Sequence, residues 1–300
     1  MADGLKAVGL TNRGVVRVVG EDARTLLDGL ITNSMAGVAP GKAIHAALLT
    51  PQGKIITDFF VTEAPDEDGG GFYCDVPLVA AADFAKRLGF YKLRAKVTIE
   101  DLSHELGVVA LWGATSAADT LSLGFVDPRL PALGMRLIAH RSQTDAVVAE
   151  LHGEAVTPDA YHAHRASLGI GEAMFDFALG QTFPHEINMD QLHGIDFKKG
   201  CYIGQEVVSR MQHRGTARTR LIQFAYAGGF NVPEGAPVLA GDKSLGVTGS
   251  ADRGVGIAMV RLDRVVDAVA AGTTITAGNV EATPVRPAWW TAPWPIVTSN

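Results

Sequence analysis

The chain has 300 residues, of which 47% are apolar and 19% charged, and its formal net charge is −6. A chain of this size can bury a substantial core, in one large domain or in two or three small ones. Its acidic balance argues against non-specific nucleic-acid binding, which depends on neutralising phosphates with Lys and Arg.

Cysteine usage and the lack of long apolar runs indicate where the protein works. Cys74 and Cys201 have no metal-ligand spacing, so a reducing compartment is the simpler interpretation. The first ten residues lack the basic and apolar regions of a signal peptide, and no run approaches the roughly 20 apolar residues that span a bilayer. We therefore expect a cytoplasmic protein with neither nucleic acid nor a membrane as partner.

The first half of the chain mixes short strands, hairpins and single helices. Residues 14–20 predict a strand and 21–31 an amphipathic helix, and 42–64 predict a hairpin whose turn suits Pro51 and Gly53. Further predicted elements are strands at 72–76, 96–101, 107–112 and 135–140, a helix from about Val79 to Leu88 and a short Ala-rich helix after Trp112. This irregular alternation favours an α+β fold over a doubly wound parallel sheet.

The second half begins with a well-marked helix and ends in a β-rich region. Thr157 can cap a helix that Pro158 begins and Gly169 ends. From about Gly215, short β-rich segments alternate with Gly, Pro and Asp turns, with a possible helical turn around Leu262–Val269. This pattern predicts a separate C-terminal barrel, with the aromatic, Pro-rich end of the chain as a strap packed over it.

The most distinctive segment is FKKGCYIGQE, residues 197–206. We expect a strand over 194–200, a turn bracketed by Gly200 and Gly204, and a helix that begins at Gln205. Residues placed before a helix N-terminus experience its partial positive charge and free backbone amides, which favour anions.

Cys201 occupies that position, close in sequence to Lys198 and Lys199. Both features favour thiolate over thiol. The alternative is that Cys201 is a small buried hydrophobe, Tyr202 a packing residue and Lys199 a solvated side chain. Glu206 and Arg210, four residues apart, can equally form a helix-surface ion pair. The residues alone therefore indicate an anion-and-thiol site and leave both interpretations open.

Residues Lys199–Glu206, KGCYIGQE, resemble the signature of the YgfZ-type folate-binding proteins, which help to assemble or maintain iron–sulfur clusters. That family is similar in fold to the T-protein, the aminomethyltransferase of the glycine cleavage system. Other segments resemble family segments in the expected order: Leu26–Asn33, Leu48–Asp58, Tyr91–Val97, Arg165–Ile170, His213–Gly215 and Leu245–Ser250. In the last of these, Gly249 stands where serine is commoner. The similarity thus covers nearly the whole chain.

The resemblance implies two interleaved α+β portions within residues 1–214 and a barrel with a terminal strap over 215–300, arranged around a central opening that binds tetrahydrofolate. It implies that Cys201 and Lys199 are the catalytic residues, with the Cys201 sulfur activated by its turn and by Lys199. The remaining motif residues are Gly200, Tyr202, Gly204, Gln205, Glu206 and Arg210.

A pteridine ring suits a pocket with apolar walls and a carboxylate or amide for its edge, and its anionic glutamate tail suits Lys or Arg at the rim. The candidate folate-binding residues are Asn33, Asp58, Asp75, Lys92, Arg94, Arg165 and Glu186, of which the first three are expected at strand or helix ends. A lone cysteine cannot hold a cluster, which usually needs four thiolate ligands. We therefore expect no permanently bound metal.

Three functions follow from the resemblance. The first is a folate-dependent factor that assembles or repairs iron–sulfur clusters in client proteins through Cys201. The second is a true aminomethyltransferase, against which the motif counts because T-proteins do not carry its cysteine. The third is a scaffold in which the Gly-Cys-Tyr turn only joins the α+β region to the barrel.

Overall fold

The structure is a computed structural model that describes residues 4–113, 124–151, 153–215 and 217–296. Contacts between residues divide the chain into two units. Unit 1 comprises Met1–Tyr161 and His193–Gln205, and unit 2 comprises His162–Leu192 and Glu206–Asn300. The domain boundary that the sequence predicts between residues 214 and 215 stays a prediction.

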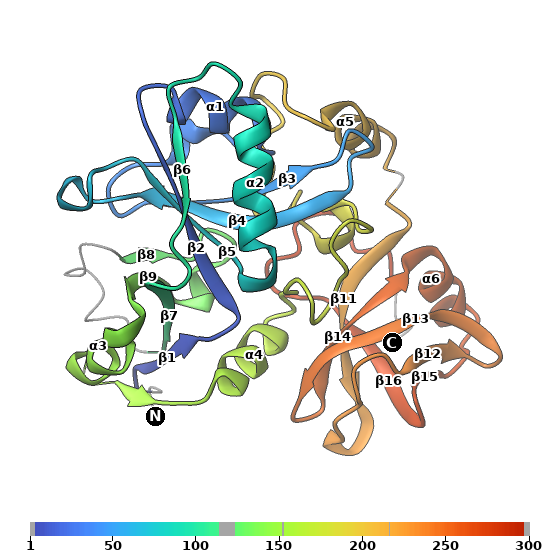
Figure 1. The fold of residues 1–300 in the computed structure, drawn as a ribbon. Helices are drawn as coiled ribbons and strands as arrows, with labels where there is room; N and C mark the ends of the chain where they lie inside the picture. The colour runs from blue at the N-terminus through green and yellow to red at the C-terminus, as the bar shows by residue number, and fades with distance from the viewer. Residues whose placement is uncertain (1–3, 114–123, 152, 216, 297–300) are drawn as a thin grey trace. The chain divides into compact units, whose positions relative to one another are not determined.

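Unit 1 contains two five-stranded sheets whose strands are interleaved along the chain (Figure 1). The first sheet has the order β10-β1-β7-β9-β8 and the second β3-β4-β5-β2-β6. Their strands are β1 Lys6–Leu10, β2 Arg13–Val19, β3 Ile44–Leu49, β4 Ile55–Glu63, β5 Phe72–Pro77, β6 Thr98–Asp101, β7 Leu106–Trp112, β8 Gly124–Val126, β9 Met135–His140 and β10 Glu154–Ala155. The chain begins in the first sheet, builds the second and returns to the first, which confirms two interleaved α+β portions.

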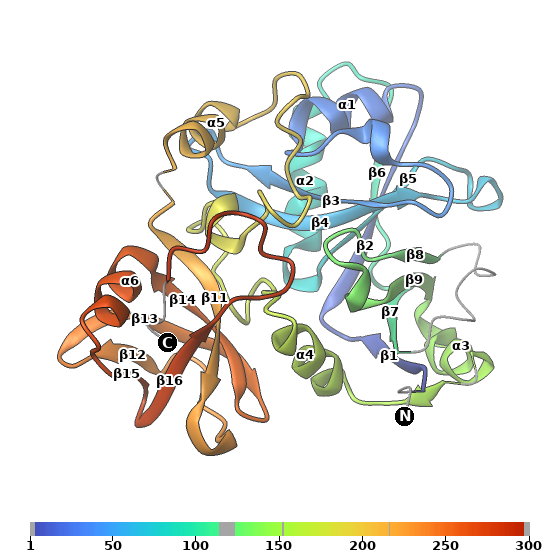
Figure 2. The same ribbon diagram turned by 180° about the vertical axis from the view of Figure 1, so that it is seen from behind.

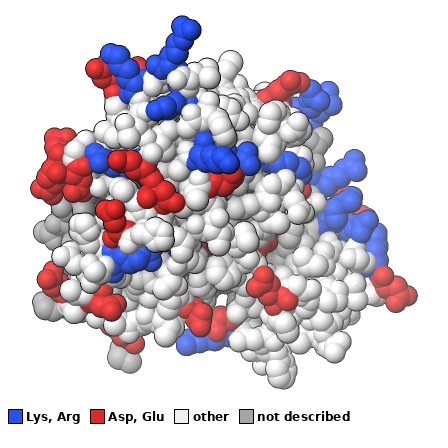
Figure 3. Space-filling model, in the orientation of Figure 1, with Lys and Arg blue, Asp and Glu red and all other residues white. Residues whose placement is uncertain are grey.

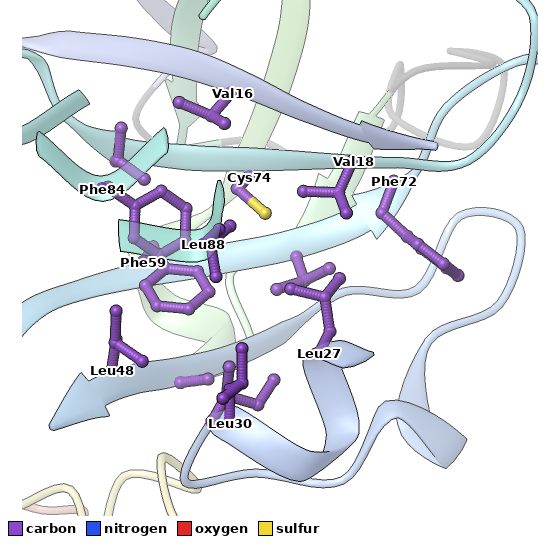
Figure 4. Packing of buried hydrophobic residues seen from close by; sticks show 14 of the residues in the cluster. Val16, Val18, Leu27, Leu30, Leu48, Phe59, Phe72, Cys74, Phe84 and Leu88 are labelled. Carbon is purple, nitrogen blue, oxygen red and sulfur yellow. The ribbon is translucent and has the colours of Figure 1, made fainter. Parts of the chain in front are cut away.

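The second sheet is covered on one face by α1 (Ala23–Leu30) and α2 (Ala81–Tyr91). Side chains at alternate positions of its strands point to this face, because successive strand residues face opposite sides of a sheet. Leu27 of α1 and Phe84 of α2 pack against Phe59 and other strand residues, and the sulfur of Cys74 lies inside this core (Figure 4). The other face carries charged residues such as Asp58 and Asp75, and its apolar residues Val15 and Tyr73 belong to a core cluster that includes strands of the first sheet.

The first sheet packs on two helices. Val148 of α3 (Thr144–Glu150) belongs to the core cluster of one face, and Tyr161 of α4 (Pro158–Ser167) to that of the other. The predicted helix start at Pro158 is confirmed, and Gly169 follows the helix with φ of +74°. The short Ala-rich helix predicted after Trp112 falls on residues 114–123, outside the described part of the chain.

Unit 2 contains a closed barrel of six antiparallel strands in the order β11-β14-β13-β12-β15-β16, seen in orange and red in Figure 2. The strands are β11 Thr219–Tyr226, β12 Pro237–Ala240, β13 Lys243–Asp252, β14 Val255–Arg261, β15 Ile275–Ala277 and β16 Val280–Val285. Trp290 and Ile296 of the chain's end belong to the barrel's core cluster. The predicted helical turn at Leu262–Val269 is instead a full amphipathic helix, α6 (Leu262–Ala270), which buries Val265 and Ala268.

Candidate functional site

The motif segment, residues 193–205, belongs to unit 1 and contains no strand over 194–200, so that prediction is wrong. The segment makes isolated hydrogen bonds to the residues that follow α1, and not the regular series of backbone hydrogen bonds that pairs two strands. The amide of Asp196 donates to the carbonyl of Thr32 at 3.0 Å, and the hydroxyl of Thr32 donates to the carbonyl of Gly194 at 2.7 Å. The Asp196 carboxylate accepts from the Lys198 amide, a local turn that competes with strand formation.

Lys199 anchors the motif segment to the end of α1. Its ammonium donates to the main-chain oxygens of Asp28, Ile31 and Asn33 at 2.6, 2.9 and 2.8 Å, and its side chain is 3% exposed. The last carbonyls of a helix lack partners within the helix, so a cation there is favourable. Burial lowers the pKa of Lys199, and the carboxylates of Asp28 and Asp196 oppose that effect.

An ammonium has three N–H donors, and Lys199 gives one to each carbonyl. No donor is left for a substrate or a thiolate. The structure therefore makes Lys199 a positioning residue, and any effect on Cys201 would act through its charge.

Gly204 anchors the segment on its other side. Its φ is +80°, and a Cβ at this position would lie 2.7 Å from the carbonyl oxygen of Thr50, in the turn between β3 and β4. A side chain is thus barred both by conformation and by contact. Gly200 differs, since its φ is not in the left-handed region and a Cβ would meet nothing within 4 Å. Of the two glycines that bracket the turn, only Gly204 has a backbone conformation and surroundings that require glycine.

Cys201 lies between these anchors as an exposed free thiol. The next residue, Tyr202, is 8% exposed, and its ring centroid is 5.4 Å from the Lys199 ammonium. Burial, helped by the charge of Asp196, raises the pKa of Tyr202 to about 12. The helix α5 (Gln205–Arg214) begins at the predicted residue. The turn therefore presents the sulfur to solvent while its neighbours are held.

Beyond the turn, the motif continues on the surface of α5. The Arg210 guanidinium donates to the Glu206 carboxylate at 2.6 Å, and the two side chains are 55% and 84% exposed. This is the helix-surface ion pair that the spacing allowed. Exposed pairs of this kind typically stabilise a helix by about 0.3–0.5 kcal/mol.

Six of the seven predicted folate-binding residues have their polar groups engaged or lie at the surface. Asn33 donates to the carbonyls of His45 and His193, which ties the motif segment to β3. Lys92 donates to the Val97 carbonyl, while Arg94 is exposed. Glu186 accepts from the Phe183 amide and so caps the short helix Pro184–Ile187 of unit 2.

Arg165, the fifth, is fully buried within unit 2. Its guanidinium pairs with the carboxylate of Asp176 and donates to the hydroxyl of Ser250, whose amide donates to Asp176 in turn. Two segments that the resemblance singled out, Arg165–Ile170 and Leu245–Ser250, thus meet in one buried ion pair. A direct folate contact is not needed to explain either.

Asp75 lies in the middle of β5, not at a strand end as predicted. Its two carboxylate oxygens are taken by Arg13 and Arg136, and Arg136 also donates to Asp127. The guanidinium of Arg136 lies 4.3 Å from the ring centroid of Phe60. The arginine cluster, which comprises Arg13, Asp75, Asp127, Arg129 and Arg136, is buried throughout.

Asp58 is also inside a strand, β4, and not at its end. One carboxylate oxygen lies 3.2 Å from Nε2 of His45, and both residues are buried. Its other oxygen, Oδ1, and Nδ1 of His45 have no hydrogen-bond partner, although buried polar atoms rarely go without one. Among the seven candidates, only Asp58 has a buried side-chain oxygen without a hydrogen-bond partner.

The charge states of this pair follow from its surroundings. Burial lowers the pKa of His45 and outweighs the opposing hydrogen bond and charge of Asp58. Burial alone would raise the pKa of Asp58, but the bond to His45 and the charges of His45, Arg13 and Arg129 lower it. A neutral imidazole beside a carboxylate is the result.

The sequence patterns did not point to several of these partners, namely Thr32, His45, Asp176 and Ser250. A histidine within the apolar run IHAALL, and a threonine within LLDGLITN, were the available signals, because polar residues in buried strands need partners. No local pattern links Asp176 to Arg165.

Unit 1 also has a pocket of about 360 Å³ beside β1, β7 and α3. None of the residues predicted from the sequence lines it. Within the described residues, no group of three or more His, Cys, Asp or Glu side chains could hold a metal ion. In the same part of the chain, no helix is both long and apolar enough to cross a membrane.

Comparison with known proteins identifies two regions. Residues 6–125 match the GCVT N-terminal domain, and residues 218–292 match the CAF17 C-terminal beta-barrel domain. The crystal structure of glycine cleavage system aminomethyltransferase T from Bartonella henselae is similar over 95% of this chain and 86% of that one, with a TM-score of 0.73 and 15% identity. The predicted T-protein-like fold is confirmed.

Curated relatives are named iron-sulfur cluster assembly factor IBA57 homolog, mitochondrial. The relative from Mycosarcoma maydis is 31% identical, and the alignment covers 74% of this chain and 57% of the relative. The relative from Coccidioides immitis is 32% identical, and the alignment covers 72% of this chain and 55% of the relative. That of Chaetomium globosum is 29% identical over 91% and 75%.

The chain spans little more than half the length of the first two of these relatives. Their mitochondrial names do not fit the cytoplasmic location that the sequence predicts. The chain thus joins a region similar to the GCVT N-terminal domain to one similar to the CAF17 barrel, on a T-protein-like fold.

Proposed function

We propose that the chain is a tetrahydrofolate-binding factor of the YgfZ type that assembles or repairs iron–sulfur clusters in client proteins, with Cys201 as its reactive group. The observation that carries this proposal is the exposed thiol of Cys201 on a turn fixed by Lys199 and Gly204. The names of the relatives as iron–sulfur cluster assembly factors support it.

Cys201 can make a transient bond to a cluster that a client or assembly protein carries. The sulfur of Cys201 forms a bond to a cluster iron as the bond between that iron and one cysteine thiolate of the carrier breaks, and the leaving thiolate takes up the proton that Cys201 releases. Because clusters usually need four thiolate ligands, one cysteine only shares a cluster with the protein that holds it. Anchoring the neighbours of Cys201 lowers the conformational entropy lost when this bond forms.

Asp58 is the acceptor that we propose for tetrahydrofolate. Its free buried oxygen suits an N–H at the edge of the pteridine ring, and the neutral His45 keeps the carboxylate in place. Lys92 and Arg94 are the proposed contacts for the anionic tail, of which the exposed Arg94 has its guanidinium available.

Calorimetric titration with tetrahydrofolate tests this assignment. Asp58→Asn keeps the shape but loses the charge, so we expect affinity to fall at least tenfold, while the exposed Asp83→Asn binds as the unchanged protein does. Equal binding by both variants would remove Asp58 from the site. Cys201→Ala should bind folate normally, which separates folate binding from the thiol chemistry.

A folate-dependent aminomethyltransferase is the alternative, and the T-protein-like fold is the observation that favours it. It predicts formation of methylene-tetrahydrofolate from an aminomethyl-lipoyl carrier protein, and robust turnover in that assay would place it first. A pure scaffold is the third candidate. It predicts that Cys201→Ser binds folate and supports client enzymes as well as the unchanged protein does.

A further inference from the structure

Three large apolar side chains are exposed on α2 and at its two ends: Val79 just before the helix, Phe90 in its last turn and Leu93 just after it. Leu93 is 86% exposed, Val79 74% and Phe90 66%. These are the three highest values among the exposed large hydrophobic residues in the described part of the chain. Single exposed apolar residues are ordinary on a protein surface, but several along one helix and its two ends point to an interaction site.

The helix has two distinct sides. Ala81, Phe84 and Leu88 are buried in the core of the second sheet. Lys86 and Phe90, four residues apart, lie on the opposite side, since residues at that spacing share a helix face. In Figure 1, α2 lies in front of the second sheet, so its outer side faces the viewer and solvent. Packing in the core therefore does not explain the apolar residues there.

The backbone at Leu93 gives a second indication. Its φ of +46° is left-handed, a conformation that is unfavourable for a residue with a side chain and that Gly or Asn adopts more readily. The side chain makes up for none of this by burial, because it is almost fully exposed. A leucine at position 93 is therefore favoured neither by the left-handed backbone nor by burial of its side chain in the folded protein.

The charges around these side chains are mainly positive. The Lys86 ammonium lies 5.9 Å from the ring centroid of Phe90, and Arg94 is exposed. Arg87 pairs with Asp83, so the acidic side chain of this helix is already neutralised. Figure 3, drawn from the same side as Figure 1, shows Lys and Arg side chains over this part of the surface. The excess of cations contrasts with the net charge of −6 of the whole chain.

We propose that this surface, the α2 face (Val79, Lys86, Phe90, Leu93 and Arg94), docks a partner protein through a segment that carries apolar and acidic side chains. A second copy of the chain is disfavoured, because a two-fold contact would oppose the same cations. An anionic bilayer is disfavoured by the chain's net charge and by the inner side of α2, which is fixed in the core. The proposal does not depend on Cys201, and the α2 face shares only Arg94 with the proposed folate contacts.

Fluorescence anisotropy with two synthetic helical peptides tests the docking surface. One has Leu at every third or fourth position with Glu between, and the other has Lys in place of Glu. We expect the Glu peptide to bind, and binding to weaken at least tenfold in Phe90→Ser/Leu93→Asn, because the apolar contacts of two side chains are lost. High salt should weaken it further by screening Lys86 and Arg94.

The variant keeps a residue that tolerates the left-handed φ at position 93, so its melting temperature should not fall. Val247→Ser, at a 49% exposed position of β13, is the matched control and should bind like the unchanged protein. The Cys201→Ala protein should also bind normally, whatever its effect on client enzymes.

Several results would overturn the proposal. Equal binding of the Glu peptide by Phe90→Ser/Leu93→Asn, or no preference for Glu over Lys, removes the α2 face as an acidic-partner site. Co-sedimentation with phosphatidylserine vesicles that the variant loses would instead identify a membrane surface. Dimerisation in analytical ultracentrifugation that the variant loses would identify a second copy as the occupant.

Discussion

The motif segment and the arginine cluster are both rich in charged residues, yet they use them in opposite ways. In the cluster, the two carboxylate oxygens of Asp75 accept hydrogen bonds from Arg13 and Arg136, so the charged groups of the cluster neutralise one another. In the motif segment, the ammonium of Lys199 donates to three main-chain carbonyls and also lies 3.8 Å from the Asp28 carboxylate, and the thiol of Cys201 stays free and exposed. Charge that serves the fold is paired and buried, whereas a group available for chemistry is left open by neighbours that are held.

The largest expected effect lies in the arginine cluster. Arg136→Met leaves Asp75 and Asp127 each short of a buried partner, which should cost about 3–5 kcal/mol of unfolding free energy. Urea denaturation measures it. Arg87→Gln breaks only an exposed pair with Asp83 and should cost about 0.5 kcal/mol or less. Similar losses for the two variants would mean that the cluster is not the structural centre of unit 1.

Lys199 is the next test, because it separates positioning from chemistry. Lys199→Met leaves three main-chain carbonyls without a donor and should lower the unfolding free energy by about 2–3 kcal/mol. Lys199→Arg should not restore it, since a planar guanidinium cannot serve three converging acceptors. The exposed neighbour gives the control: Lys198→Met should lie within about 0.5 kcal/mol of the unchanged protein. A mild Lys199→Met would contradict the anchoring role.

Two glycines of the motif provide a matched pair. Gly204→Ala forces a side chain into a left-handed conformation against the Thr50 carbonyl and should cost about 1–3 kcal/mol. Gly200→Ala meets open space and should cost less than about 1 kcal/mol. Thermal melting of the two variants measures the difference. Equal melting temperatures would show that the turn is not held at Gly204.

The smallest effect is the pH dependence of the buried His45. Its folded pKa lies below the ordinary value, so the unfolded chain binds the proton more readily. Stability should therefore fall as the pH drops below the ordinary histidine range of about 6.5, until the folded pKa is reached. His185, whose pKa burial also lowers, acts in the same direction. His45→Gln should flatten the slope of urea midpoint against pH between about 7 and 5, and an unchanged slope would refute the assignment.

Much of the fold was predictable because local patterns carried it. The hairpin around Gly53, the helix from Pro158 and the helix start at Gln205 all rest on turn and cap residues, whose conformational preferences act locally. The barrel strands were predictable from their regular Gly, Pro and Asp turns.

The individual site residues were harder to assign. Asp58 and Asp75 look alike in sequence, as carboxylates in β-rich segments, and only their cross-strand neighbours distinguish them. Arg165 was predicted to bind folate because nothing near it in sequence reveals Asp176 as its partner. The segment 194–200 contains strand-forming residues, but its bonds to the chain after α1 are tertiary and override that preference.

The central claim is that the Cys201 sulfur acts on client proteins, and its most direct test is the activity of a cluster-dependent client enzyme in cells that have only a cysteine variant of this chain. Cys74, sealed in the core where burial raises its pKa, is the internal control. We predict that Cys201→Ala lowers client activity severely while Cys74→Ala, at a temperature where it stays folded, sustains it. Full client activity with Cys201→Ala would contradict the account.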